Sequence, residues 1–263
     1  MSIVDREDIA SARRIVVKVG SSSISGDNTD QLHDLVDALA RVHTESVEVI
    51  LVSSGAIATG LPYLSLTNRP DDLATQQAAA AVGQNLLIHR YQDSLDRYSI
   101  VAGQVLLTAG DLDNQIPRSN AKRAVERLLQ LRILPIVNEN DTVATHEIRF
   151  GDNDRLAALV AGLVGADLLV LLSDVDALYT KPPSEPGAQR IRQVTWGDPL
   201  TGVEVTSKGL SSVGTGGAVT KVAAARHATD AGTAVLLTST AQASAALRGD
   251  DVGTWFEPAP VRG

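Results

Sequence analysis

Short apolar runs along the chain alternate with longer segments in which apolar residues recur at helical spacing. Six of these runs are predicted to form buried strands. They cover residues 14–20, 47–52, 100–107, 133–137, 168–172 and 234–238. The run at 168–172 reads Leu-Leu-Val-Leu-Leu, and a strand without polar alternation is typical of a parallel sheet that is covered on both faces.

Helical periodicity is clearest after the first strand, where five apolar residues keep i, i+3, i+4, i+7 spacing: Leu32, Leu35, Val36, Leu39 and Val42. The predicted helices cover residues 28–43, 71–96, 156–164 and 221–231, with another one capped by Ser119 or Asn120 and a short one from residue 241. Because strands and helices mostly alternate, the pattern favours an α/β fold, a three-layer αβα sandwich with a largely parallel central sheet.

A long polar stretch at residues 138–154 separates one predicted strand from the next helix. Connections in α/β units usually take about 2–6 residues, so its length and its many amides and carboxylates predict a binding site. The alternative is a solvated hairpin at residues 143–150, followed by a helix cap at Asp152. Asn153 and Asp154 would then lie in the first helical turn, but three such residues exceed what one cap needs.

Composition narrows the possible functions. A chain of 263 residues fits one large domain or two small ones. The absence of cysteine excludes disulfides, cysteine nucleophiles and cysteine zinc sites. A formal net charge of −8 argues against non-specific nucleic-acid binding, but it does not exclude a small anionic ligand. With a charged start and no apolar run near the ~20 residues of a membrane span, the protein is expected to be cytoplasmic.

Lysine is scarce, and two of the lysines adjoin turns that suit anions. Lys18 interrupts the apolar strand at residues 14–20, which runs into Gly20-Ser-Ser-Ser23, and Lys221 closes the segment Gly214-Thr-Gly-Gly-Ala-Val-Thr-Lys221. Glycine lets backbone N–H groups approach an anion, and a glycine-rich turn before a helix suits a polyphosphate. The alternatives are a strand lysine that extends to solvent and a surface lysine beside an ordinary loop.

Neither familiar nucleotide motif is present. The segment 214–221 lacks the G-x-x-x-x-G-K-[ST] order of a Walker A loop, and Val219 occupies the third glycine position of a dinucleotide fingerprint. Two other strand ends carry suitable groups. Residues 53–60 form a Ser-Ser-Gly turn before a helix, and Ser173-Asp174 follows the strand at 168–172, where ligands bind in open α/β sheets.

The histidines show no metal-ligand spacing, and no Ser-His-Asp arrangement is readable. Two lysines, several anion-binding turns and a polar stretch remain. Phosphoryl transfer needs mainly in-line positioning and neutralisation of charge. An acceptor that is already a carboxylate needs no general base, so such a reaction matches a chain with cations and anion-binding turns but no evident catalytic histidine.

Five segments in sequence order carry a family resemblance: Val17-Lys-Val-Gly-Ser-Ser22, Val52-Ser-Ser-Gly-Ala-Ile57, Asn138-Glu-Asn-Asp-Thr-Val143, Gly151-Asp-Asn-Asp154 and the segment 214–221. Together they resemble the amino acid kinase family over nearly the whole chain. The Asn-Glu-Asn-Asp and Gly-Asp-Asn-Asp pair is similar to the branch that phosphorylates glutamate. The resemblance implies the amino acid kinase fold and transfer of the ATP γ-phosphoryl group to the side-chain carboxylate of L-glutamate, for proline synthesis.

Carried over by position, the resemblance implies that Lys18 and Lys221 neutralise the phosphoryl group in the transition state, and that Asp154 holds both. The residues implied for glutamate binding are Ser54, Asp141 and Asn153, with Asn138 and Arg149 in support. Those implied for ATP are Lys18, Ser173, Asp174, Thr215, Gly216, Gly217, Ala218, Val219, Thr220 and Lys221. Relatives often carry Met where Ala218 stands. Mg²⁺ is expected to be held mainly by the ATP phosphates, without a protein metal site.

Two alternatives stay open: a family member that acts on another acid, such as N-acetylglutamate or aspartate, and a non-catalytic sensor of ATP and an amino acid. The resemblance also implies a homo-oligomer, a dimer or tetramer, with proline as a feedback inhibitor acting near residues 138–154. No membrane or nucleic-acid partner is expected. Many relatives continue into a PUA domain, whereas here we expect a kinase domain over residues 1–257, in which the segment from Trp255 resembles a strand, and a linker-like tail over 258–263.

Overall fold

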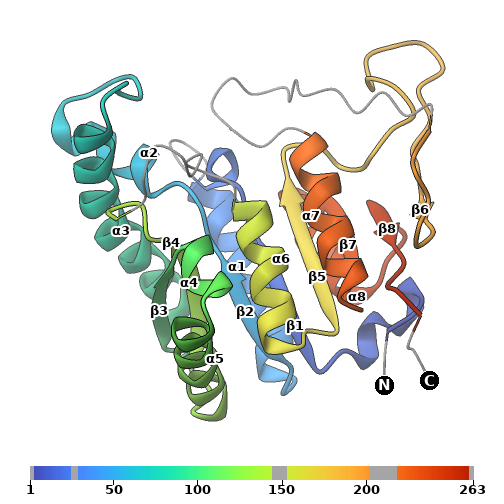
Figure 1. The fold of residues 1–263 in the computed structure, drawn as a ribbon, viewed down its shortest axis with the longest axis horizontal. Helices are drawn as coiled ribbons and strands as arrows, with labels where there is room; N and C mark the ends of the chain where they lie inside the picture. The colour runs from blue at the N-terminus through green and yellow to red at the C-terminus, as the bar shows by residue number, and fades with distance from the viewer. Residues whose placement is uncertain (1–2, 25–28, 144–152, 202–217, 261–263) are drawn as a thin grey trace.

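The computed structural model describes residues 3–24, 29–143, 153–201 and 218–260 (Figure 1). The strands in these ranges are β1 (Arg14–Lys18), β2 (Glu48–Val52), β3 (Ala102–Leu107), β4 (Leu134–Glu139), β5 (Leu168–Ser173), β6 (Gln193–Val194), β7 (Ala234–Ser239) and β8 (Thr254–Phe256). The helices are α1 (Thr29–Thr44), α2 (Ala56–Gly60), α3 (Leu73–Asp96), α4 (Ala109–Asp113), α5 (Gln115–Gln130), α6 (Asn153–Val164), α7 (Ala218–Asp230) and α8 (Ala243–Arg248). Short 3₁₀ helices are η1 (Arg6–Ser11), η2 (Ser21–Ser23), η3 (Leu61–Leu64) and η4 (Thr240–Gln242).

One sheet contains all of these strands, in the order β3-β4-β2-β1-β5-β7-β8-β6. Every neighbouring pair from β3 to β7 is parallel, β8 is antiparallel to β7, and β6 is parallel to β8. The prediction of a largely parallel sheet is therefore confirmed. In such a sheet the carboxyl ends of the parallel strands meet at one edge, which is where open α/β folds bind ligands.

Two hydrophobic cores cover the two faces of the sheet. In β1, Ile15 and Val17 point into the core that α1, α3 and α8 complete, while Val16 points into the core completed by α5, α6 and α7. Figure 1 looks onto the layer of α5, α6 and α7. Both faces of the central strands are dry, so the strands need apolar residues at every position. Burial of the central strands on both faces thus explains the apolar runs in the sequence. The predicted three-layer sandwich is confirmed.

All six predicted strands are present, with ends shifted by one or two residues. β4 runs on to Glu139, so Asn138 and Glu139 belong to the strand and not to the loop after it. β8 contains Trp255, where the sequence already resembled a strand. β6 was not predicted, because two residues carry too little pattern to identify a strand.

The helix expected to start at Ser119 or Asn120 begins earlier, at Gln115. That start was wrong because Ser119 and Asn120, which are residue types that often cap helices, lie inside this helix, and Pro117 lies in its first turn. Proline is tolerated in the first turn of a helix, where its missing N–H would have no intrahelical partner. The short α4 before it was also missed, although Thr108 and Asp111 form a capping box there.

Helices α2 and α3 cross at two glycines with almost no space between them. A Cβ atom on Gly60 would lie 2.0 Å from the carbonyl oxygen of Ala79, and one on Gly83 would lie 1.7 Å from that of Ala56. Only glycine allows this approach. The crossing fixes α2, and with it the turn at residues 53–55 that leads from β2 into α2.

Two sequence predictions concern residues that lie mostly outside the described ranges. The hairpin expected at residues 143–150 and the cap at Asp152 fall outside the described residues, apart from Val143. Among the helices that are described, none combines the length and apolar character needed to cross a bilayer.

Candidate active site

Three charged side chains meet at the carboxyl-terminal edge of the sheet. Lys18 ends β1, Asp154 lies in the first turn of α6, and Lys221 lies near the start of α7. The Nζ atom of Lys18 is 2.6 Å from Oδ1 of Asp154, and the Nζ atom of Lys221 is 3.2 Å from Oδ2. The fold therefore brings together the three residues that were predicted to be catalytic.

These side chains are deeply buried, with exposed fractions of 5% for Lys18, 6% for Lys221 and 2% for Asp154. The alternatives of a solvent-reaching strand lysine and a surface lysine are therefore wrong. Burial raises the pKa of Asp154, but the charges of Lys18 and Lys221 more than offset this effect and lower the pKa to about 2. Two ammonium groups and one carboxylate leave this cluster of three with a net positive charge, which suits an anionic ligand.

The helix ends reinforce this charge. Helices α6 and α7 both begin at the cluster, with Asp154 and Lys221 near their N-termini. Their N-terminal N–H groups and helix dipoles add partial positive charge. The electrostatics of the site thus favour a ligand that carries more than one negative charge, as a polyphosphate does.

Two glycine turns border the cluster. A Cβ atom on Gly20 would lie 3.9 Å from the Nζ atom of Lys18, so the absent side chain leaves space beside this ammonium group. Gly55 has a φ of +94°, and its Cβ atom would lie 3.1 Å from that of Ser21. The turn after β1 therefore packs tightly against the turn after β2, which contains Ser54. Glycine provides both the backbone conformation and the close approach.

A chain of buried amides joins the strand ends on the other side of the cluster. The Nδ2 atom of Asn153 donates to the carbonyl oxygen of Ser53 at 2.7 Å and to Oδ1 of Asn138 at 2.9 Å. These contacts connect β2, β4 and the start of α6. Asn138, Asn153 and the Ser53–Ser54 turn, predicted for the acceptor substrate, therefore lie together.

Asp141 follows β4 and has an exposed fraction of 8%. Burial raises the pKa of Asp141 to about 6, and Arg69 opposes this effect only in part. A cationic ligand group, such as an ammonium, would stabilise the ionised form of a buried carboxylate of this kind. Perturbed pKa values of this size are frequent at functional sites.

Ser173 and Asp174 lie at the end of β5, beside β1 in the sheet, and the Oγ atom of Ser173 donates to Oδ1 of Asp174 at 2.9 Å. Ala218, Val219 and Thr220 form the first turn of α7, and the Oγ1 atom of Thr220 donates to Oδ2 of Asp154 at 3.4 Å. Four other predicted residues lie outside the described residues: Arg149, Thr215, Gly216 and Gly217. The described part of the nucleotide half thus adjoins the lysine cluster.

Sequence reasoning missed two buried polar residues of this site, Gln84 and Tyr91, both from α3. The hydroxyl of Tyr91 is 3.0 Å from Oγ of Ser53, and Gln84 is hydrogen-bonded to Asn138 at 3.1 Å. The only signal was the presence of polar side chains on the face of α3 that also carries Leu87 and Leu95. Such a pattern indicates that a polar side chain is buried, but it does not show which residue that side chain contacts.

Comparisons with known proteins agree on one family. The sequence model described as "Amino acid kinase family" matches residues 13–239. A "Glutamate 5-kinase" of Leifsonia xyli subsp. xyli is 74% identical over 259 residues, covering 98% of this chain and 96% of the relative. One from Clavibacter michiganensis subsp. michiganensis is also 74% identical, covering 98% of this chain and 99% of the relative.

A more distant relative differs in length. The "Glutamate 5-kinase" of Thermobifida fusca is 58% identical, and the match covers 98% of this chain but 67% of that protein. Among solved structures, a carbamate kinase from Giardia lamblia bound to AMP-PNP superposes with a TM-score of 0.69 at 15% identity. The superposition covers 95% of this chain and 99% of the carbamate kinase chain, which supports the fold.

Proposed function

The chain belongs to the amino acid kinase family, and we propose that it transfers the γ-phosphoryl group of ATP to the side-chain carboxylate of L-glutamate. The product is L-glutamyl 5-phosphate, and the reaction is the first step of proline biosynthesis. The proposal is supported by relatives of 74% identity over 98% of the chain. The structural observation that carries it is the buried pair of lysines sharing Asp154.

The lysine cluster performs the charge-dependent part of the reaction. As the phosphoryl group passes from ADP to the acceptor, negative charge is spread over its oxygens. Lys18 and Lys221 neutralise this charge, while Asp154 holds both ammonium groups at one place. Because these side chains are buried and held in place, each contact is worth more than in water. Mg²⁺ bound to the ATP phosphates supplies further neutralisation.

The acceptor side follows from the chemistry of glutamate. Its α-ammonium needs an anionic or acceptor partner, which Asp141 and Asn153 provide, and its carboxylates need donors such as the Ser54 hydroxyl and backbone N–H groups. Asn138 supports Asn153 through the hydrogen bond between them. We assign Arg149 a supporting role as well. The acceptor carboxylate is already ionised at neutral pH, so no general base is required.

The nucleotide side comprises Ser173 and Asp174 at the end of β5 together with residues 215–221. Ser173 and Asp174 follow a strand next to β1, so a nucleotide bound there directs its phosphates toward Lys18. The N–H groups at the start of α7 suit the phosphates. The space beside Gly20 then lies where the two substrates meet.

One assay discriminates between the candidate functions. The protein is incubated with ATP, Mg²⁺, hydroxylamine and a single acid, and acyl hydroxamate and ADP are measured. Glutamate-dependent product supports the proposal. Product only with N-acetylglutamate or aspartate would indicate a family member of other specificity. Binding of ATP and glutamate without product would indicate a sensor.

Proline shares an α-carboxylate and a protonated amine with glutamate. We therefore propose that proline, as a feedback inhibitor, binds where glutamate does, in or near residues 138–154. Inhibition that is competitive with glutamate is expected in steady-state kinetics. Strictly non-competitive inhibition would require a separate site.

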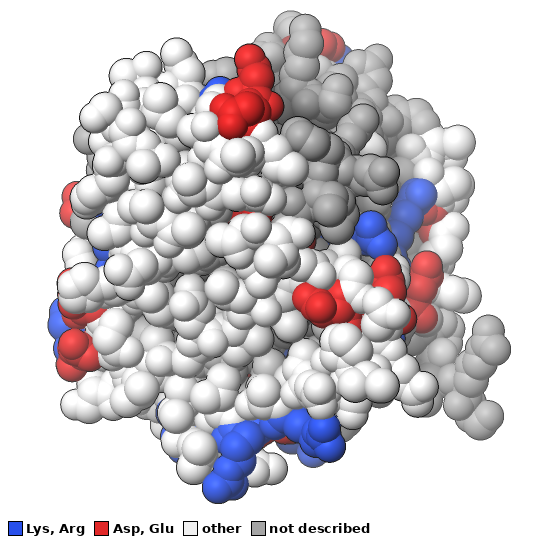
Figure 2. All heavy atoms as spheres, turned by 60° about the vertical axis from the view of Figure 1, so that its left-hand side comes forward, with Lys and Arg blue, Asp and Glu red and all other residues white. Residues whose placement is uncertain are grey.

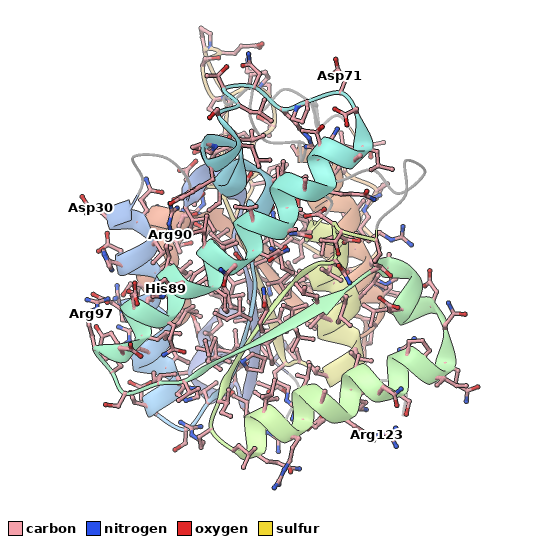
Figure 3. All side chains as sticks on the ribbon, turned by 90° about the vertical axis from the view of Figure 1, so that its left-hand side faces the viewer. Asp30, Asp71, His89, Arg90, Arg97 and Arg123 are labelled. Carbon is pink, nitrogen blue, oxygen red and sulfur yellow. The ribbon has the colours of Figure 1, made fainter. Side chains whose placement is uncertain are left out.

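We also propose that the protein is a homo-oligomer that associates through α3 and β3. β3 is the last strand on its side of the sheet, and α3 has no charged residue between Asp72 and His89. Figure 2 shows a broad face without charged side chains. In Figure 3, where α3, β3 and α5 face the viewer, Asp71, Arg97 and Arg123 lie near the outline of the molecule, and Arg90 lies on α3 beyond its uncharged part. An uncharged face beside an open sheet edge suits a second copy of the chain.

We assign residues 1–257 to one kinase domain, since both hydrophobic cores draw on strands from β1 to β8, and residues 258–263 to a linker-like tail. We place the protein in the cytoplasm, where ATP and glutamate are available. The lack of cysteine is consistent with that reducing compartment.

A further inference from the structure

Gln84 lies on α3, was not predicted to contact a substrate, and is buried beside the end of β4. Its Nε2 atom donates to the backbone carbonyl oxygen of Glu139 at 3.0 Å. Its Oε1 atom accepts from Nδ2 of Asn138 at 3.1 Å. A buried amide is costly unless both ends are satisfied, and here both ends are.

The direction of this amide is determined by its neighbour. A carbonyl oxygen can only accept, so the NH₂ group of Gln84 must face Glu139 and its oxygen must face Asn138. Asn138 has the matching orientation, with its NH₂ group toward Gln84. Its Oδ1 atom accepts from the backbone N–H of Glu139 at 2.9 Å and from Nδ2 of Asn153 at 2.9 Å.

The orientation of Asn153, the next amide in the chain, is fixed in the same way by its hydrogen-bond partners. Both of its NH₂ hydrogens are used, one toward Asn138 and the other toward the carbonyl oxygen of Ser53. Its Oδ1 atom is buried and accepts no hydrogen bond within the described residues. The end of the amide chain therefore offers an acceptor, not a donor.

We propose that Gln84 is a positioning residue for the acceptor substrate: it holds the chain Gln84–Asn138–Asn153 in place from α3, so that Asn153 presents an oxygen to the α-ammonium group of the amino acid. This inference rests on the proposed function. Gln84 does not touch the substrate. It makes the site selective for an acid that carries an amine, because Asn138 and Asn153, when no longer held by Gln84, would let the Asn153 oxygen shift away from that ammonium.

The test uses Gln84→Met, which keeps the length of the side chain and removes its polarity, and Gln84→Glu, which keeps the shape and removes the donor. Each variant is assayed with L-glutamate and with glutarate, which lacks only the amine. We expect KM for glutamate to rise about 10-fold or more, with kcat and KM for ATP little changed. The preference for glutamate over glutarate should fall by a similar factor.

Gln104→Met is the matched control. Gln104 also donates to Oε1 of Gln84, at 3.4 Å, but it lies outside the chain and its side chain is exposed. This variant should keep the wild-type preference. If Gln84→Met does not fold, as judged by thermal unfolding, Gln84→Glu carries the test.

Equal losses with glutamate and glutarate would reduce Gln84 to a structural role and overturn the inference. So would an unchanged preference in a folded variant. Failure of the proposed function is a different result, in which the unmodified protein gives no glutamate-dependent product. In that case calorimetric binding of L-glutamate and glutarate to the same variants still tests Gln84.

Discussion

Lys221 provides one of two buried ammonium groups that share Asp154, and its effect should fall on turnover more than on binding. Lys221→Met removes a positive charge that matters most in the transition state of phosphoryl transfer. We expect kcat to fall about 10²-fold or more, with KM for glutamate little changed. Steady-state kinetics measure both. Lys122→Met, an exposed lysine on α5, is the control, and a loss confined to KM would contradict the assigned role.

Asp141 should make the stability of the unliganded protein depend on pH. Burial raises the pKa of Asp141 from 3.8 to about 6. The stability gained from its neutral form is fully present below pH 3.8 and is lost as the pH rises through about 6. Asp141→Asn is therefore expected to stabilise the unliganded protein at pH 7 by about 1–3 kcal/mol. Urea unfolding without substrate measures this difference.

The same carboxylate should control substrate affinity in the opposite sense. Its ionised form attracts the α-ammonium of glutamate, so KM for glutamate should rise as the pH falls below about 6. At pH 7, Asp141→Asn should raise this KM about 10-fold or more. Asp113→Asn, an exposed change on α4, serves as the control. A KM that does not depend on pH would remove Asp141 from the substrate site.

At the scale of elements, the crossing of α2 and α3 determines where the turn after β2 lies. Gly83→Ala would place a Cβ atom 1.7 Å from the carbonyl oxygen of Ala56, so the helices must separate. We expect a loss of about 1–3 kcal/mol in the free energy of unfolding, together with reduced activity, because α2 follows Ser54. Chemical denaturation and the hydroxamate assay measure the two effects.

The matched control is Gly162→Ala in α6. The atom nearest to the added Cβ atom would be the Cβ atom of Ala231 at 4.0 Å, which is an ordinary contact. Alanine is the better helix former by up to ~1 kcal/mol, so this variant should be equal to or more stable than the wild type. If both variants behaved alike, close packing at Gly83 would not be the cause.

At the scale of the whole molecule, the uncharged face over α3 and β3 predicts how copies of the chain associate. Ala81 is exposed on α3, and Ala81→Glu adds a charge that would have to be buried in the interface. We expect the oligomer to dissociate in light scattering coupled to size-exclusion chromatography. Ala223→Glu adds the same charge to an exposed position on α7 and should leave the mass unchanged. Dissociation by both variants, or by neither, would contradict this interface.

Much of the fold was readable because burial on both faces of a parallel sheet leaves a strong pattern. The run at 168–172 became β5, and the segment with helical spacing at 28–43 became α1. The start of α5 was not readable, because Pro117 is compatible both with a break and with a first helical turn. Local signals of this kind are ambiguous until tertiary packing selects one state.

The sequence by itself determined the three-layer fold, the family, and the residue types that a phosphoryl-transfer site requires. These depend on short-range patterns and on motif order, and both are written in the chain. Only the tertiary structure decided that Lys18 and Lys221 share Asp154, that Asp141 is buried, and that Gln84 is hydrogen-bonded to Asn138, which in turn accepts from Asn153. Contacts between distant segments depend on how strands and helices pack, so the direction of an amide or the pKa of a carboxylate is a property of the folded molecule.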